Sequence, residues 1–282
     1  MNETPAEYGV IGHPVTHSRS PFIHGMFARQ TGQNMVYRLH DVPPENLHAY
    51  VMDFWRRGGR GLNVTVPHKV PACTMVRALS ERATRAGAVN TLLMDQDGIT
   101  GDNTDGAGLV RDLCDNLGLV ITNRRLLIIG AGGATRGILA PLLGLEPTVV
   151  VIANRTADRA EALAAAFSDL GSTQGVGFEY IEAAPFDLII NATSASLSGD
   201  IPPIPDAALS AQTVCYDLAY GRSATAFVRW AHGKGCARAL QGLGMLVEQA
   251  AESFRLWRGV RPSTARVMDA LRERAGGAYA DP

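Results

Sequence analysis

The sequence predicts a two-domain α/β protein whose second domain is a doubly wound parallel sheet. The chain has 282 residues, 46% of them hydrophobic, which is enough for two hydrophobic cores. Strand-like apolar runs alternate with segments of helical periodicity along the chain. From about residue 105 onward the runs are continuously apolar, as in parallel strands covered by helices on both faces.

Composition excludes several classes of protein. A net charge of −1 disfavours a nucleic-acid binder, which needs a basic surface. No apolar run approaches the roughly 20 residues of a membrane-spanning helix, and the amino terminus lacks the basic and apolar regions of a secretory signal. The cysteines form no Cys-x-x-Cys pair, so we expect neither a zinc motif nor a disulfide framework, and a cytoplasmic protein. They are Cys73, Cys114, Cys215 and Cys236.

The first domain is expected to begin with a strand at 8–12. A helix then starts with Ser20 as N-cap and Pro21 at its first position, and Gly32 ends it. The β-branched and alternating segments that follow predict further strands, separated by a helix that Pro43-Pro44 opens. These strands are expected at 35–39, 62–66 and 88–94.

The second domain is expected to open with a helix over 109–117 that ends at Gly118. Continuous apolar runs then predict buried strands, with helices around 139–143 and 160–167 between them. The strands are expected at 126–129, 148–152, 188–190 and 213–214. Helices at 242–258 and from Pro262 close the chain. The expected domains are 1–104, completed by 241–282, and 105–240.

A glycine-rich segment, Gly130–Arg136, follows an apolar strand directly and precedes a helix directly. Glycines at this position let backbone N–H groups approach a pyrophosphate, and the helix amino terminus adds partial positive charge. The third glycine position of the G-x-G-x-x-G pattern is Thr135. The segment indicates a dinucleotide site, and the alternative is a tight turn that binds nothing.

The end of the next strand indicates which dinucleotide binds. A domain that prefers NAD ends this strand in Asp or Glu, whereas here it ends in Asn154-Arg155-Thr156, with Arg159 one turn later. Guanidinium groups bind phosphate oxygens in bidentate geometry. The pattern favours NADP(H), and the alternative is a pair of solvated arginines.

Several polar segments of the first domain are expected at one edge of its sheet, near the boundary between the domains. They are Ser18–Ser20, Asn63–Lys69, Asn90 and Asp102–Gly106. Ligands of open α/β sheets bind beyond the carboxyl ends of strands, and hydroxyl and amide groups suit a polyhydroxylated ligand. Each residue alone also has a structural explanation: Ser20 as a helix cap, Asp105 as a turn former and Lys69 as a solvated charge.

Together these segments follow a recognisable order with other short motifs. The motifs are His17–Pro21, Asn63–Lys69, Gly87–Thr91, Gly101–Gly106, Gly130–Arg136, Asn154–Thr156, Asn191–Ser194 and Gly242–Leu246 with Gln249. In these motifs and their order the chain resembles the shikimate dehydrogenase family over almost its whole length. The family often has Asp where Gln241 stands here.

The resemblance implies two α/β domains, the second of Rossmann type, with C-terminal helices that pack back on the first. It implies the reduction of 3-dehydroshikimate to shikimate, in aromatic amino acid biosynthesis, with NADP(H) as cofactor. Lys69 and Asp105 would be the catalytic pair. The substrate would be held by Ser18, Ser20, Thr65, Asn90, Tyr216 and Gln249. The cofactor would be held by Gly130, Ala131, Gly132, Gly133, Ala134, Asn154, Arg155, Thr156, Arg159 and Thr193, with Met245 beside the nicotinamide.

The implied chemistry gives the charged pair distinct roles. Hydride transfer to a ketone builds negative charge on its oxygen, which a cationic donor such as Lys69 stabilises and protonates. Asp105 would orient that lysine. Two other functions stay open: a quinate/shikimate dehydrogenase, and a non-catalytic regulator that responds to NADP(H).

Metal chemistry and macromolecular partners are not expected. His13 and His17 are four residues apart, but Pro14 lies between them and rules out a helical ligand pair. We therefore expect no metal, a small-molecule substrate, no nucleic-acid or membrane partner, and a monomer or homodimer.

Overall fold

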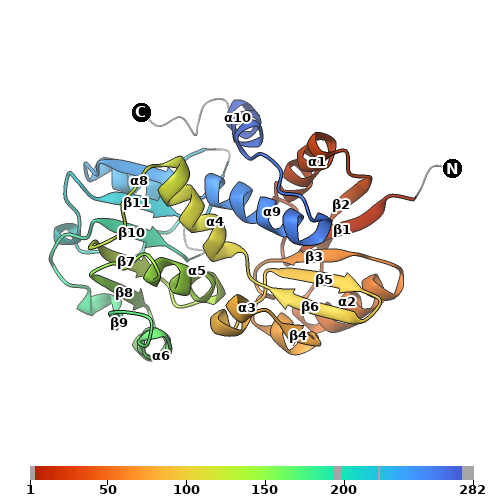
Figure 1. Ribbon diagram of the computed structural model, residues 1–282. Coiled ribbons are helices and arrows are strands. Elements are labelled where there is room, and N and C mark those ends of the chain that lie inside the picture. The colour runs from red at the N-terminus through yellow and green to blue at the C-terminus, as the bar shows by residue number, and fades with distance from the viewer. Residues whose placement is uncertain (1–3, 194–198, 222, 275–282) are drawn as a thin grey trace. The chain divides into compact units, whose positions relative to one another are not determined.

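The computed structural model describes residues 4–193, 199–221 and 223–274. The chain divides into two compact units (Figure 1): Met1–Gly108 with Val247–Val267, and Leu109–Leu246 with Met268–Pro282. It passes between them inside the helices α4 (Asp105–Arg111), α9 (Leu243–Arg258) and α10 (Ala265–Arg274). The divisions differ from the expected boundaries at 104/105 and 240/241 because helices, rather than loops with a sequence signal, connect the units.

The first unit is built on a six-stranded mixed sheet of order β2-β1-β3-β5-β6-β4. β1 pairs in parallel with β2 and β3, whereas β5 runs antiparallel to both β3 and β6. The strands are β1 (Ala6–Gly12), β2 (Met35–Asp41), β3 (Gly61–Val64), β4 (Ala78–Leu79), β5 (Thr91–Asp95) and β6 (Gly98–Asp102).

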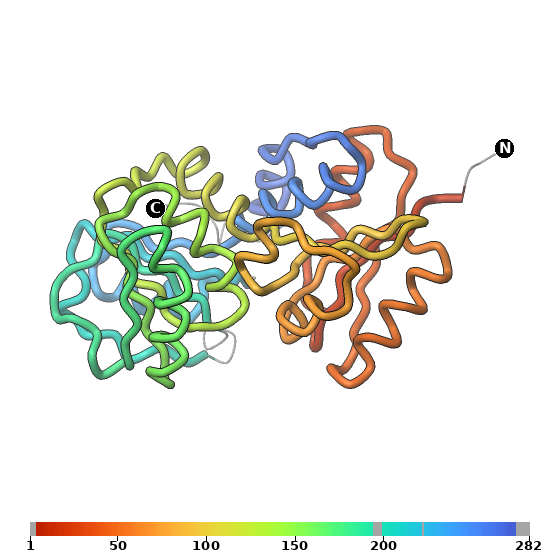
Figure 2. The backbone as a smooth tube through the Cα atoms, turned by 60° about the horizontal axis from the view of Figure 1, so that its bottom comes forward, coloured from red at the N-terminus to blue at the C-terminus, as the bar shows by residue number. Residues whose placement is uncertain are grey.

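Helices cover both faces of this sheet. α2 (Leu47–Arg56) and α3 (Glu81–Ala86) pack on one face through a core that includes Phe54, Leu62 and Leu92. On the other face, α1 (Ser20–Thr31) contacts the second half of α9, with the Phe27 and Phe254 rings 5.7 Å apart. Figure 2 shows this part of the blue C-terminal segment beside the red α1.

The second unit is built on a six-stranded sheet of order β12-β11-β10-β7-β8-β9, in which every pair is parallel. Counted along this unit, the strand order is 3-2-1-4-5-6, which defines the Rossmann fold. The strands are β7 (Arg125–Ile129), β8 (Val149–Asn154), β9 (Thr173–Gly177), β10 (Leu188–Asn191), β11 (Val214–Asp217) and β12 (Arg238–Gln241). The predicted fold class is confirmed.

Alternate residues of these strands enter two separate cores. Leu126 and Ile128 face the core formed with α5 (Gly133–Leu143) and α6 (Ala157–Phe167). Leu127 and Ile129 face the core formed with α8 (Ala226–Gly233). All four side chains are 0% exposed, which explains why these strands read as continuous apolar runs.

Helix ends agree with the sequence at some positions and not at others. Gly32 ends α1 with a left-handed conformation at φ +66, as predicted. Ser20 is the first residue of α1 rather than its N-cap; Arg19 occupies the cap position and no side chain caps the helix. The Ser20 hydroxyl instead accepts a hydrogen bond from the Ser18 hydroxyl at 3.1 Å. The last helix begins at Ala265, beyond the expected Pro262.

No helix among the described residues is long and apolar enough to span a membrane.

Candidate active site

Strand direction brings three loops to the same edge of the first unit's sheet. Asn63 of β3 is in register with Thr91 of β5, which is in register with Asp102 of β6. Because β5 is antiparallel to its neighbours, the carboxyl ends of β3 and β6 lie beside its amino end. Lys69 therefore lies on the loop after β3, Asn90 directly before β5, and residues 103–105 directly after β6.

Lys69 and Asp105 form a close ion pair at this edge. The Lys69 Nζ lies 2.5 Å from Asp105 Oδ2, and the side chains are 16% and 5% exposed. The Lys69 carbonyl oxygen accepts a hydrogen bond from Val89 N at 2.8 Å, and this bond fixes the loop that carries Lys69. A charge-assisted hydrogen bond this far removed from water is stronger than one at the surface, so the ammonium group has a defined position.

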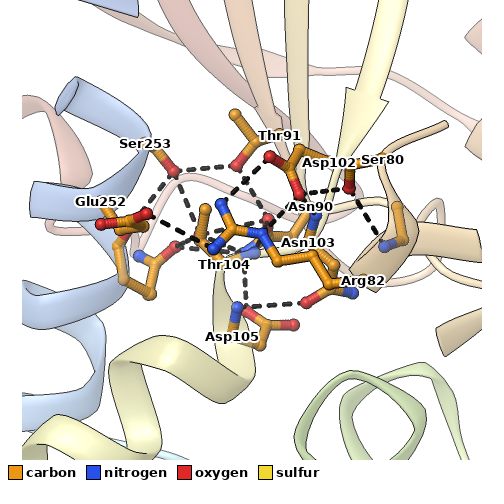
Figure 3. A network of polar contacts seen from close by, with 12 residues as sticks. Ser80, Arg82, Asn90, Thr91, Asp102, Asn103, Thr104, Asp105, Glu252 and Ser253 are labelled. Atoms are coloured by element: carbon orange, nitrogen blue, oxygen red, sulfur yellow. Dashed lines mark hydrogen bonds and ion pairs between the residues drawn. The ribbon is translucent and has the colours of Figure 1, made fainter. Parts of the chain in front are cut away.

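Asn90 holds the other oxygen of the Asp105 carboxylate. Its Oδ1 accepts from the backbone N of Thr104 at 2.8 Å and from the Thr91 hydroxyl at 2.8 Å. Because a backbone N–H only donates, this contact fixes which end of the amide is oxygen. The Nδ2 group therefore faces Asp105 Oδ1, at 2.8 Å (Figure 3). It also lies 3.3 Å from Gln249 Oε1.

A further layer of buried polar side chains supports Asn90. The Ser253 hydroxyl, on α9, lies 2.8 Å from the Thr91 hydroxyl and accepts from Asn63 Nδ2 at 2.9 Å. Asn63 Oδ1 in turn accepts from the Tyr37 hydroxyl at 2.7 Å. The sequence interpretation did not single out Ser253; its spacing of four residues from Gln249, on one helix face, was the available signal.

Ion pairs fix the part of α9 that carries Gln249. Arg82 of α3 binds both oxygens of Asp102, at 2.6 and 3.0 Å, and reaches Glu252 at 3.4 Å. Arg261 binds Glu248 at 2.6 Å and Glu252 at 3.0 Å. Figure 3 shows Arg82 between the end of β6 and α9. Because Glu248 and Glu252 flank Gln249, these pairs help to place its amide beside Asn90.

Ser18, Ser20 and Thr65 lie on segments that leave the same sheet edge. Ser18 and Ser20 follow β1, and Thr65 follows β3, which is parallel to β1. Thr65 N donates to Ile11 O at 2.9 Å. Within the described ranges, no recorded hydrogen bond joins these three side chains to Lys69 or Asp105, so their roles in holding a substrate stay predictions.

The glycine-rich loop of the second unit joins β7 to the start of α5. Gly130 directly follows β7 and has φ +104, a conformation that favours glycine, and its N–H donates to Ala153 O at 2.7 Å. Gly132 occupies the N-cap position of α5, and a Cβ added there meets nothing within 4 Å. The start of α5 therefore has an open approach for an anion.

Neighbouring strands complete this edge of the second unit. A Cβ on Gly130 would meet Thr193 Cγ2 at 3.0 Å, so the loops after β7 and β10 are adjacent. The strand order reverses between β7 and β10, where Rossmann folds bind dinucleotides. Ser194, the last residue of the motif 191–194, lies outside the described residues.

The end of β8 and the turn after it carry the residues expected to bind the 2′-phosphate on the adenosine ribose of NADP(H). Asn154 Oδ1 accepts from Ala131 N at 3.3 Å and its Nδ2 donates to Thr156 O at 3.0 Å, which ties this turn to the glycine-rich loop. Arg155 and Arg159 are exposed. Within the part of the chain that the structure describes, neither forms a recorded ion pair. The turn offers two guanidinium groups and no carboxylate at the Asn154 position.

Tyr216 and Met245 lie beside Asp112, the first residue of the π-helical segment η3 (Asp112–Asn116), which continues α4. The fully buried Tyr216 hydroxyl donates to Asp112 Oδ2 at 2.6 Å and accepts from Met245 N at 3.3 Å. Burial, followed by the Asp112 charge, raises the pKa of Tyr216 well above its ordinary value. These contacts give Tyr216 a structural partner within the second unit, and its role at a substrate stays a prediction.

Gln241 takes a structural role as well. Its Oε1 accepts from Gly221 N at 2.9 Å and so holds the segment after β11.

The chain joins a Rossmann unit, which can hold a phosphorylated dinucleotide, to a unit with a buried lysine–aspartate pair. This combination is typical of a dinucleotide-dependent oxidoreductase. Family models describe the same arrangement: the "Shikimate dehydrogenase substrate binding domain" matches residues 10–92 and "Shikimate / quinate 5-dehydrogenase" matches 113–199. The "Shikimate 5'-dehydrogenase C-terminal domain" matches 242–272.

Individual relatives agree with these matches. The shikimate dehydrogenase (NADP(+)) of Methylococcus capsulatus is 55% identical over 95% of this chain and 96% of its own. The chain therefore belongs to the shikimate dehydrogenase family.

Solved structures extend the comparison. Shikimate 5-dehydrogenase from Thermus thermophilus, in complex with NADP(H) and shikimate, is 34% identical, with a TM-score of 0.84 over 95% of this chain and 99% of that chain. The 5-ketofructose reductase of a Gluconobacter strain is 28% identical, with a TM-score of 0.82 over 95% and 98%. The fold thus also occurs in an enzyme named for another substrate.

Proposed function

We propose that this protein catalyses the reversible NADPH-dependent reduction of 3-dehydroshikimate to shikimate, in the pathway to the aromatic amino acids. The observation that carries the proposal is the Lys69–Asp105 pair, with 2.5 Å between Nζ and Oδ2, held by the oriented amide of Asn90. A protein that only sensed NADP(H) would not need this buried pair. The 55% identity to a shikimate dehydrogenase supports the choice of substrate.

Lys69 supplies the proton of the reaction. When a ketone is reduced, negative charge develops on its oxygen, and an ammonium group stabilises that charge and donates a proton to it. Asp105 orients the ammonium group through Oδ2, while Asn90 holds Oδ1 and keeps the carboxylate from rotating. Because the pair is mostly buried, little water competes for the lysine protons.

The substrate's remaining groups are assigned to the polar side chains of the same unit. Gln249 and Asn90 present amide groups, and Ser18, Ser20 and Thr65 present hydroxyl groups, to a carboxylate and ring hydroxyls. Uncharged donors and acceptors of this kind select by geometry, since each hydroxyl that fails to pair leaves a polar group unsatisfied.

The second unit holds NADP(H), and its residues fit that group. The open approach at Gly132 admits the pyrophosphate, and Arg155, Thr156 and Arg159 would bind the 2′-phosphate. Gly130, Ala131, Gly133 and Ala134 complete the loop, and Thr193 and Met245 would line the nicotinamide end. When bound, the cofactor supplies the hydride.

A matrix of steady-state assays tests the proposal. Purified protein is assayed with shikimate or quinate, each with NADP+ or NAD+. The proposal predicts the highest kcat/KM for shikimate with NADP+. A preference for quinate would establish the alternative quinate activity, and no turnover with either substrate would leave an NADP(H)-responsive regulator.

Two broader assignments accompany the activity. A cytoplasmic location is supported by the biosynthetic role of the relatives, and the low net charge of −1 gives no reason to expect a nucleic-acid partner. We assign a monomer or homodimer, which size-exclusion chromatography with light scattering distinguishes.

A further inference from the structure

Two cysteine sulfurs lie close together in the second unit, and neither cysteine is among the residues assigned to catalysis or to the cofactor. The Cys215 Sγ, on β11, is 3.6 Å from the Cys236 Sγ, in the turn between α8 and β12. Both are free thiols in this structure. We propose that Cys215 and Cys236 form a modification site at which hydroperoxides produce a reversible disulfide.

The two thiols differ in access and in acidity. Cys236 is half-buried, whereas Cys215 is 0% exposed within the core that contains Phe227 and Ala231. The hydrogen bond from Cys215 lowers the pKa of Cys236, and the same contact together with burial raises the pKa of Cys215. Cys236 is therefore the thiol that a small oxidant reaches and that supplies the thiolate.

The chemistry balances with a hydroperoxide as the only oxidant. The Cys236 thiolate attacks one oxygen of hydrogen peroxide, the O–O bond breaks, and a sulfenic acid and hydroxide form. The Cys215 sulfur then attacks the sulfenic sulfur, its thiol proton passes to the departing hydroxide, and water leaves. Two thiols and one peroxide thus give one disulfide and two waters.

The local backbone has room for the sulfurs to approach to the ~2.0 Å of a disulfide. Gly235, directly before Cys236, has φ +76, and a Cβ there would meet nothing within 4 Å. Cys236 N makes only a long hydrogen bond, 3.3 Å, to Ala231 O. Cys215 is held in the β11–β12 ladder, in register with Ala239, whereas Cys236 lies before the first pair of that ladder, Val214 and Arg238. Closure therefore requires movement on the Cys236 side, outside the ladder.

The disulfide is expected to change stability and not catalysis. It closes a loop over 216–235, which contains α8, and so restricts the unfolded chain. Cys215 faces the core on the α8 side of the sheet, whereas its neighbour Tyr216 and Met245 face the other core. Within the described part of the second unit, no hydrogen bond joins either thiol side chain to the glycine-rich loop that begins at Gly130.

The test oxidises the full-length protein with a small excess of hydrogen peroxide and compares it with the reduced protein. We expect a mass lower by two hydrogen atoms, a proteolytic peptide that links Cys215 to Cys236, and an unfolding temperature higher by about 5 °C. The rate with shikimate and NADP+ should not change, and dithiothreitol should reverse every effect.

Matched variants make the outcome decisive. Cys236→Ser should abolish the linked peptide and the thermal shift, whereas Cys73→Ser combined with Cys114→Ser should retain both. A sulfinic acid on Cys236 with no cross-link would overturn the proposal, as would a disulfide that involves Cys73 or Cys114. Since activity is measured separately, failure of the disulfide leaves the proposed reaction intact, and absence of turnover leaves the disulfide result interpretable.

Discussion

His24 is buried within an aromatic cluster of the first unit, and acidification should therefore destabilise the fold through it. Its ring is 0% exposed and stacks on Tyr37, with centroids 4.2 Å apart and planes at 5°. Phe27, Phe254 and Trp257 surround it. Burial lowers the pKa of His24 from 6.5 to about 3, with a smaller opposing contribution from the Asn63 side chain.

The direction and size of this loss of stability follow from how many protons His24 binds in the folded and in the unfolded chain. Between pH 6.5 and about 3 the unfolded chain binds a proton at His24 that the folded chain does not. Stability from this residue is therefore complete above pH 6.5 and falls as the pH drops, by about 1.4 kcal/mol per unit. At pH 5 the predicted loss is about 2 kcal/mol.

Urea unfolding at several pH values, followed by the fluorescence of the three tryptophans, measures this loss. His24→Phe keeps an aromatic ring in the cluster and removes the titrating group. Between pH 7 and pH 5 the free energy of unfolding of the parent should therefore fall by about 2 kcal/mol more than that of the variant. His48→Gln, at an exposed position on α2, serves as the control and should keep the parent's pH dependence. Equal slopes for His24→Phe and the parent would refute the argument.

Other predictions concern the cofactor unit. Replacing Arg155 and Arg159 together with Ala should lower the ratio of kcat/KM for NADP+ over NAD+ by on the order of 10²-fold, because two charged hydrogen-bond donors to the 2′-phosphate are lost; an unchanged ratio would contradict the assignment. Gly132→Ala should leave the unfolding temperature unchanged, since the added methyl meets nothing within 4 Å, and should raise the KM for NADP+ about tenfold. Gly175→Ala should lower the stability by ~3 kcal/mol, because its Cβ would lie 2.3 Å from the Ala160 backbone, and the folded variant should bind NADP+ with normal affinity. Calorimetry and cofactor titration distinguish the effects of the two glycine substitutions.

The sequence predicted the parts of the fold that local pattern determines. The apolar runs at 126–129 and 188–190 became β7 and β10, and the glycine-rich segment became the turn 130–132 and the first residues of α5. The pattern was weaker where a strand is short or partly exposed. β4 is two residues long, and β9 contains glycines where its backbone approaches α6, so neither was predicted.

The sequence did not predict the polar contacts that surround the Lys69–Asp105 pair. Nothing local indicates that Ser253 contacts Thr91, or that Arg82 joins Asp102 to Glu252, because these contacts depend on how α9 packs against the sheet. Motif order brought Lys69, Asn90 and Asp105 into one list, but only the antiparallel register of β5 explains why they converge.

The most direct test of the central claim, that Lys69 beside Asp105 protonates the reduced ketone, is turnover of the Lys69→Ala variant. We expect kcat to fall by about 10²-fold or more, with the dissociation constant of NADPH and the unfolding temperature close to those of the parent. Near-normal turnover in a folded Lys69→Ala protein that binds NADPH would remove Lys69 from the mechanism.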